Sequence, residues 1–134
     1  MPLVLATAHL SDDEFLTAFD SCRLMNSEFR YADHLRLAWL HLHGETLETA
    51  LFRVRTGIQT FATHHGAAHL YHETITTAWV RLLATHHEKS FDEFLKENEH
   101  QLSLNLLHRF WTPDLLAGQE ARKRWVPPDR RDLP

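Results

Sequence analysis

The stretch Thr46–Gly66, TLETALFRVRTGIQTFATHHG, decides the fold class. Its apolar residues recur at intervals of four, three, four and three: Leu47, Leu51, Val54, Ile58 and Phe61. This spacing places them on one face of an α-helix, which has 3.6 residues per turn. A helix with one apolar face must bury that face against other elements. The stretch therefore predicts an amphipathic helix that contributes to a core and ends at Gly66.

Similar helix signals lie on both sides of this stretch. Ser11-Asp12-Asp13-Glu14 and Ser90-Phe91-Asp92-Glu93 are both capping boxes, in which a serine accepts from the backbone and a glutamate reaches back. Helical patterns also cover residues 29–43 and 71–87. Thr112-Pro113 indicates a further start, because proline is favoured in the first turn of a helix. Amphipathic helices with short connections favour a helical bundle.

The length of 134 residues fits one domain that buries about two thirds of its surface without a disulfide or a structural metal. The run Trp125–Asp129 contains two prolines, so the chain must leave the helical conformation there. We therefore predict an all-α fold, a compact antiparallel bundle of about five to six helices. It forms a single domain over 1–134, with an N-terminal lead at 1–10 and an extended tail at 126–134.

Composition excludes some classes of function. The net charge of −4 disfavours nucleic acid as the main partner, because binding to phosphates needs a basic surface. No stretch reaches the roughly 20 apolar residues of a membrane span. The segment Met1–Leu10 lacks the positive residue that precedes the apolar run of a signal peptide. We expect a cytoplasmic protein that binds neither nucleic acid nor membranes.

Histidine is abundant, with 12 residues, and some histidines are predicted to face the interior. On the helix at 29–43, a rotation of about 100° per residue places Asp33 and Arg36 in one sector, which is the expected solvent face. His34 lies opposite that sector and is expected to face the core. On the helix at 71–87, Thr74 and Arg81 share the polar sector, and His72 lies opposite Arg81.

A lone histidine that faces the core is most often a packed side chain bonded to a carbonyl or hydroxyl group. Here His65 continues the apolar stripe of Thr46–Gly66, so three helices each direct a histidine inward. Buried polar groups cost free energy unless they are paired, so they tend to lie together. His34, His72, His65 and Glu73 are therefore candidate ligands of a divalent metal such as zinc, iron or manganese.

A metal-free site is the other chemistry that fits. Glu73 would orient His72, which would act as the general base, and Tyr71 would donate a hydrogen bond. The expected pocket is walled by Trp39, Thr76 and Trp79. The start His72-Glu73 resembles the zinc-protease pattern H-E-x-x-H, but Thr76 occupies the position of the second histidine, so we reject that function.

Several segments together resemble a family of small bacterial all-helical proteins with no established activity. They are His34-Leu35 with Ala38-Trp39, then Tyr71-His72-Glu73-Thr74 with Thr76 and Trp79, and finally Ala121-Arg122 with Trp125-Val126 and Pro128-Asp129. The resemblance implies that six residues form one feature: His34, Tyr71, His72, Glu73, Thr76 and Trp79. A remote architectural likeness is to the DinB/YfiT-like bundles, in which three histidines hold a divalent metal.

Two functions remain open from the sequence. In the first, a buried His/Glu site binds a divalent metal or a small polar ligand and carries out metal-assisted or acid–base chemistry on it. In the second, the protein is non-catalytic: the histidines form a hydrogen-bond network in the core, and the surface binds a partner. A homodimer is left open in both.

Overall fold

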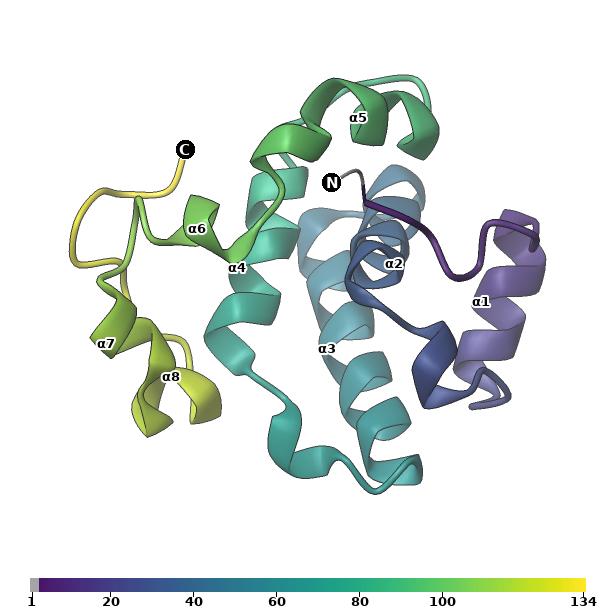
Figure 1. Ribbon diagram of the computed structural model, residues 1–134, viewed down its shortest axis with the longest axis horizontal. Helices are drawn as coiled ribbons and strands as arrows, with labels where there is room; N and C mark the ends of the chain where they lie inside the picture. Colours follow the sequence, from purple (N-terminus) through teal and green to yellow (C-terminus); the bar gives the residue numbers. More distant parts are fainter. Residues whose placement is uncertain (1–2) are drawn as a thin grey trace.

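The structure, a computed structural model, describes residues 3–134 and confirms the all-helical fold class. Three long helices form its centre: α2 (Tyr31–Gly44), α3 (Leu47–His64) and α4 (Glu73–Leu83). Each of the three packs against the other two (Figure 1). No helix in the described part of the chain is long and apolar enough to cross a membrane.

Shorter helices surround this centre. They are α1 (Asp12–Asp20), α5 (Phe91–Asn98), α6 (Leu104–Leu107), α7 (Pro113–Ala117) and α8 (Gln119–Lys123), with 3₁₀ turns at Asn26–Glu28, Ala68–Leu70 and Glu99–Gln101. Helix α1 packs on α3, α5 on α2, and α8 on both α4 and α7. Residues 3–134 thus contain eight α-helices, more than the five to six expected, because the chain after α5 forms three short helices.

The stripe that predicted α3 is buried over most of its length. Val54, Ile58 and Phe61 are in the core, whereas Leu47 at the start of the helix is 45% exposed. Gly57 lies against Phe19 of α1, and a Cβ atom at this glycine would be only 2.8 Å from the phenyl ring. The close approach of α1 to α3 is therefore possible because residue 57 is a glycine and has no side chain. Burial of the whole stripe was expected, and its first turn is the exception.

Asp33 and Arg36 of α2, both predicted to face solvent, are buried, so that prediction was wrong for these two residues. Asp33 is 0% exposed because the N-terminal lead crosses over it. Its carboxylate accepts from the backbone N–H groups of Ala6, Thr7 and Arg30, at 3.2, 3.0 and 3.1 Å, and from the hydroxyl of Thr7. Helical periodicity identified a polar face, but it carries no information on polar backbone that covers that face.

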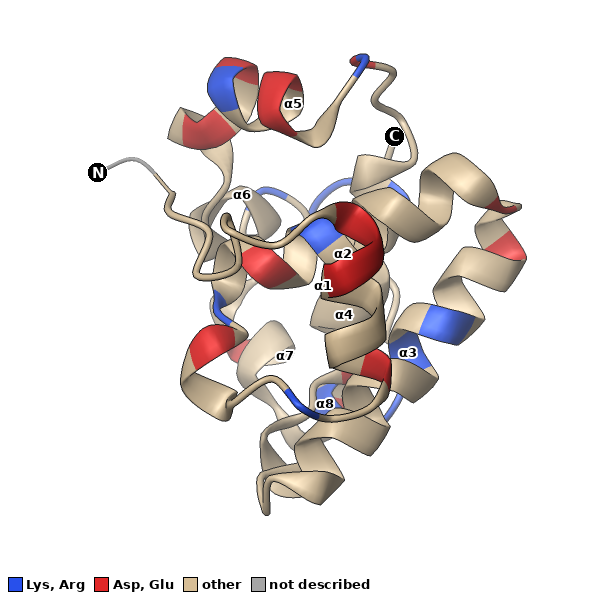
Figure 2. Cartoon of the chain, turned by 90° about the vertical axis from the view of Figure 1, so that its right-hand side faces the viewer, with Lys and Arg blue, Asp and Glu red and all other residues tan. Residues whose placement is uncertain are grey.

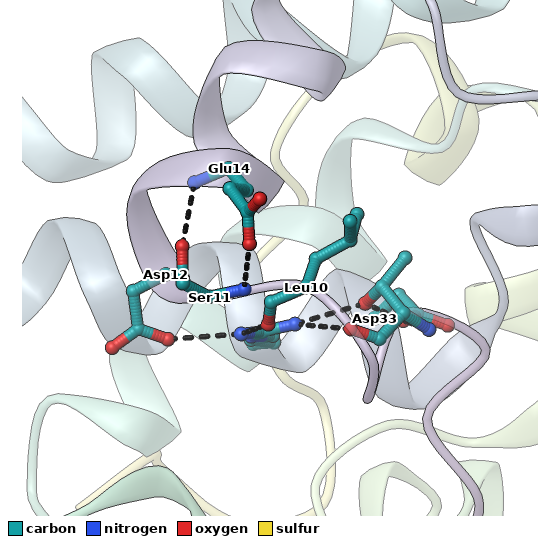
Figure 3. A network of polar contacts seen from close by, with 7 residues as sticks. Leu10, Ser11, Asp12, Glu14 and Asp33 are labelled. Carbon is teal, nitrogen blue, oxygen red and sulfur yellow. Dashed lines mark hydrogen bonds and ion pairs between the residues drawn. The ribbon is translucent and has the colours of Figure 1, made fainter.

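Arg36, one turn further along α2, extends this network and is 6% exposed. Its guanidinium donates to the backbone carbonyls of Thr7 and Leu10, both at 2.8 Å, and forms an ion pair with Asp12 at 3.0 Å (Figure 3). It also lies 4.6 Å above the ring of Phe15, a cation–π distance. The lead at 3–11 is therefore fixed to α2 by buried polar contacts.

Both predicted capping boxes begin helices, but only the first is complete. The Ser11 hydroxyl accepts from the Glu14 backbone, and the Glu14 carboxylate accepts from the Ser11 backbone (Figure 3). The first turn of α1 is also acidic, which suits the positive end of the helix dipole (Figure 2). Before α5, Ser90 caps Glu93 as expected, but the Glu93 carboxylate accepts from Lys89 instead.

The C-terminal tail is extended, as predicted, and folds back on the helices (Figure 1). The indole of Trp111 donates to the carbonyl of Val126 at 2.9 Å. The hydroxyl of Thr74 on α4 donates to the Arg124 carbonyl and accepts from the Val126 backbone. Thr74 is 0% exposed, which contradicts its predicted place on the solvent side of the helix. The tail thus covers a polar stripe of α4, as the lead covers one of α2.

Candidate functional site

A pocket of about 450 Å³ opens between α2, α3 and α4. It is lined by Tyr31, His34, Leu35, Ala38, Val54, Ile58, Leu70, Tyr71, His72, Ile75, Thr76, Trp79, Val80 and Arg122. A mostly apolar lining with a few convergent polar groups, at this volume, is typical of small-molecule sites. Five residues predicted from the sequence line it together, namely His34, Tyr71, His72, Thr76 and Trp79, whereas Trp39, His65 and Glu73 do not.

His34 is the polar side chain that α2 contributes to this pocket. Its ring stacks on Phe29, with centroids 4.0 Å apart. Burial lowers the pKa of His34 to about 4, and the nearby Asp33 charge and the Phe29 backbone only partly oppose this shift. The imidazole is therefore neutral at pH 7, with one N–H donor and one acceptor nitrogen. Within residues 3–134 it forms no hydrogen bond with another side chain.

His72 also lines the pocket, but both of its ring nitrogens are engaged by the protein. Nδ1 accepts from the backbone N–H of Ile75 at 3.1 Å, so His72 is the N-cap of α4. Nε2 lies 2.7 Å from the carbonyl oxygen of Leu116 in α7. Since a carbonyl only accepts, Nε2 carries the proton and the ring is the neutral tautomer. Burial, the largest cause, lowers the pKa of His72, which agrees with a neutral ring. His72 therefore connects the start of α4 to α7.

Glu73 is buried beside the pocket and does not pair with His72. Its carboxylate forms an ion pair with Arg55 of α3 at 2.8 Å and accepts from the Tyr71 hydroxyl at 2.7 Å. Burial and this glutamate raise the pKa of Tyr71. The structure therefore joins Glu73 to Tyr71 and Arg55, where the sequence had predicted a pair of Glu73 with His72. Glu73 positions Tyr71 at the pocket wall.

Arg122, on α8, lies at the pocket, and sequence reasoning missed it. Its Nη1 donates to the carbonyl oxygens of Leu70 at 3.0 Å and Tyr71 at 3.3 Å. From the sequence alone, the basic run Arg122-Lys123-Arg124 fits favourable charge at a helix C-terminus, with anion binding as the alternative. The sequence contains no local signal for this role, because the contact joins residues about 50 positions apart.

The four predicted metal ligands do not form one cluster. The ring of His65 contacts that of Phe61 in a tilted arrangement, with centroids 4.4 Å apart, and its buried Nε2 atom has no partner within the described part of the chain. Its neighbour Phe61 contacts Phe29, on which His34 stacks. Among residues 3–134, no group of three or more His, Cys, Asp or Glu side chains is placed to hold a metal ion. Binding of zinc, iron or manganese stays a prediction.

Trp39 was expected to wall the pocket and lies elsewhere. Its ring stacks on His43 at 4.0 Å and contacts Phe94 of α5 at 5.0 Å. It lines a second hollow, of about 670 Å³, between the N-terminal lead, α2 and α5. Trp79 is the tryptophan that walls the candidate site, and its ring is in edge contact with Tyr31 at 5.8 Å.

Comparison of the chain with protein-family models, with curated proteins and with solved structures found no match. The geometry of the pocket is therefore the basis on which a function is proposed.

Proposed function

We propose that the protein binds a small organic ligand in the pocket between α2, α3 and α4. The observation that carries this proposal is the pocket itself, where His34 of α2, Thr76 and Trp79 of α4, and Tyr71 just before α4 line one space of about 450 Å³. The neutral ring of His34 lines this space, and within residues 3–134 only the Phe29 backbone, and no side chain, is its hydrogen-bond partner. A polar ring at a cavity with one nitrogen left for a partner is a natural contact for a ligand.

The side chains of the pocket provide both apolar and polar contacts for a ligand. Trp79 and Tyr31 offer aromatic surface, and the hydroxyl of Thr76 adds a polar contact. Because burial lowers the pKa of His34, its ring is neutral at pH 7 and offers a ligand a hydrogen-bond acceptor. In this proposal His34 is therefore a binding residue rather than a general base. His72, to which the sequence analysis gave that role, already uses both nitrogens within the protein.

The non-catalytic alternative describes His72 well, because its two hydrogen bonds hold α4 and α7 together. The metal version of the site would require His72 and Glu73 to leave their present partners. Elemental analysis of protein purified without an affinity tag and then incubated with zinc, iron and manganese tests that version. A stoichiometric metal, lost in His34→Ala but retained in His43→Ala, would favour it over the organic ligand.

A fragment screen followed by amide chemical-shift mapping tests the organic-ligand proposal. We expect fragments with a dissociation constant of about 1 mM or better, which corresponds to about 4 kcal/mol of binding free energy, to shift the amides of Tyr71, Thr76 and Trp79. Thr76→Phe should fill the pocket and weaken this binding at least tenfold. The matched control is Thr85→Phe, an exposed threonine just beyond the end of α4.

The same titration contains the results that would overturn the proposal. They are a screen in which no fragment shifts the pocket amides, or unchanged affinity in a folded Thr76→Phe variant. If that variant does not fold, His34→Leu replaces it, with His43→Leu as the control. Fragments that hydrogen-bond through a polar group should then lose affinity only in His34→Leu.

A further inference from the structure

The pocket between α2, α3 and α4 has a single permanent charge in its lining, that of Arg122. The two histidines of the lining, His34 and His72, are neutral at pH 7, because burial lowers the pKa of both. Two buried carboxylates lie near the pocket but outside its lining: Glu73 forms an ion pair with Arg55, and Asp33, next to His34, accepts from the backbone N–H groups of the N-terminal lead. The lining itself therefore carries one positive charge, although the whole chain has a net charge of −4.

The guanidinium of Arg122 is fixed on one edge. Its Nη1 donates to the carbonyl oxygens of Leu70 and Tyr71, and more weakly to that of His69 at 3.5 Å. Its Nε and Nη2 atoms have no hydrogen-bond partner, and Arg122 has no ion pair, within residues 3–134. An arginine carries five N–H donors in a planar fork, so the opposite edge can bind an acceptor with two oxygens.

We propose that the ligand is a small organic acid, with its carboxylate on Arg122 and its apolar part between Trp79 and the aliphatic side chains. This inference rests on the proposed function, because it assigns a chemical class to the ligand of the same pocket. A planar carboxylate matches a guanidinium edge in a bidentate manner. One positive charge balances one carboxylate, whereas a phosphate group carries up to two negative charges at pH 7.

In this arrangement the Arg122 guanidinium binds one end of the ligand and the neutral His34 ring binds the other. Arg122 lies on α8 and His34 on α2, so the carboxylate and a second polar group of the ligand would contact different helices. The apolar side chains Leu35, Ile58 and Val80 of the lining fill the space between them. The site thus favours an acid with an aromatic or aliphatic body over a compact polar acid such as acetate.

Matched pairs of acids and amides test this inference on the full chain. Phenylacetate is titrated against phenylacetamide, and indole-3-acetate against indole-3-acetamide, with the amide shifts of Tyr71 and Trp79 as the readout. We expect each acid to bind at least tenfold more tightly than its amide at low salt. This preference should fall as sodium chloride is added, since an exposed ion pair is screened.

Arg122→Gln should abolish the preference for the acid while the amide still binds. Arg124→Gln is the matched control, because Arg124 is an exposed neighbour whose ion pair with Glu120 lies outside the pocket. Arg122→Lys retains the charge but loses the planar fork, and we expect it to retain only part of the preference. If Arg122→Gln does not fold, the salt dependence in the unaltered protein and the Arg122→Lys variant decide the question.

The outcomes separate this inference from the proposed function. Equal binding of acids and amides in the unaltered protein overturns the inference and leaves a ligand pocket in place. An acid preference that survives in Arg122→Gln also overturns it, because the charge must then be recognised elsewhere. Failure of both acids and amides, and of every other fragment, to shift the pocket amides overturns the proposed function itself.

Discussion

Asp33 and His34 are neighbours on α2, and the protein treats these two polar residues in opposite ways. Asp33 points toward the N-terminal lead, where three backbone N–H groups and one hydroxyl group satisfy its carboxylate. His34 points toward the pocket and, within residues 3–134, hydrogen-bonds no other side chain. The comparison teaches that burial alone does not mark a functional residue. A polar group whose partners all come from the protein stabilises the fold, and one that faces a cavity is available to a ligand.

Removal of the Asp33 carboxylate should have the largest effect of the predictions made here. Asp33→Ala leaves the backbone N–H groups of Ala6, Thr7 and Arg30 without their acceptor, and each unsatisfied buried group costs about 1–3 kcal/mol. We expect a loss of about 3 kcal/mol or more in the free energy of unfolding, measured from urea denaturation. His34→Ala should lower the free energy of unfolding by only about 1 kcal/mol, because it removes packing contacts but no hydrogen bond to another side chain.

The comparison fails if the two variants destabilise the protein equally. Asp33→Asn provides a finer control, because the amide has the shape of the carboxylate but donates where the carboxylate accepts. It should therefore be intermediate between the unaltered protein and Asp33→Ala.

The same contrast occurs on α4 between Thr74 and Thr76. Thr74 is fully buried, and its hydroxyl both donates to and accepts from the C-terminal tail. Thr74→Val should therefore cost about 1–3 kcal/mol and expose the tail to proteolysis near Val126, because both contacts are lost. Thr76→Val, at the pocket, should be close to neutral. Limited proteolysis and urea unfolding measure the two effects, and a protected tail in Thr74→Val would refute the proposed anchor.

The sequence predicts the helices well, but it predicts poorly the buried hydrogen-bond networks around Asp33 and Thr74. The stripe from Val54 to Phe61 and the capping boxes at Ser11 and Ser90 are local features, so the spacing of residues identified α1, α3 and α5. The burial of Asp33 depends on a lead more than 20 residues away. Helical periodicity takes the sector richest in polar residues as the solvent-facing one, so it assigned Asp33 and Thr74 to the wrong side.

The candidate site was predicted in part for the same reason. Tyr71, Thr76 and Trp79 belong to one short segment that was assigned to the same site as the inward-facing His34, and all four residues line the pocket. Arg122 was missed because it reaches the pocket from α8, which α4 contacts only in the folded chain. The side-chain partners of Glu73 could not be inferred either, since Arg55 lies 18 residues away on another helix.

The protonation of His34 gives a smaller effect that depends on pH. Its folded pKa is about 4, and that of a histidine in the unfolded chain is about 6.5. The unfolded chain therefore binds a proton first, so the contribution of His34 is fully present above pH 6.5 and is lost as the pH falls toward 4. We expect the free energy of unfolding to fall by about 1 kcal/mol between pH 7.5 and 5.5 through this residue.

The measurement is urea unfolding at several pH values, with His34→Leu as the variant that should lose this part of the pH dependence. A variant with the same pH dependence as the unaltered protein would contradict a neutral, buried His34. Occupation of the pocket should change the apparent pKa of His34, whereas no ligand reaches Asp33.

His72 gives the most informative expected effect, because it lies between the two classes. It lines the pocket as His34 does, yet its nitrogens are satisfied as completely as the carboxylate of Asp33. Asparagine is a good N-cap residue, so His72→Asn should retain the bond from Ile75 and lose only the contact with Leu116. We expect it to cost about 1 kcal/mol, the typical net value of one hydrogen bond. His72→Ala loses the cap as well and should cost about 2 kcal/mol. If His72→Ala were no worse than His72→Asn in urea unfolding, the cap would contribute nothing, and His72 would belong with His34 among the groups available to a ligand.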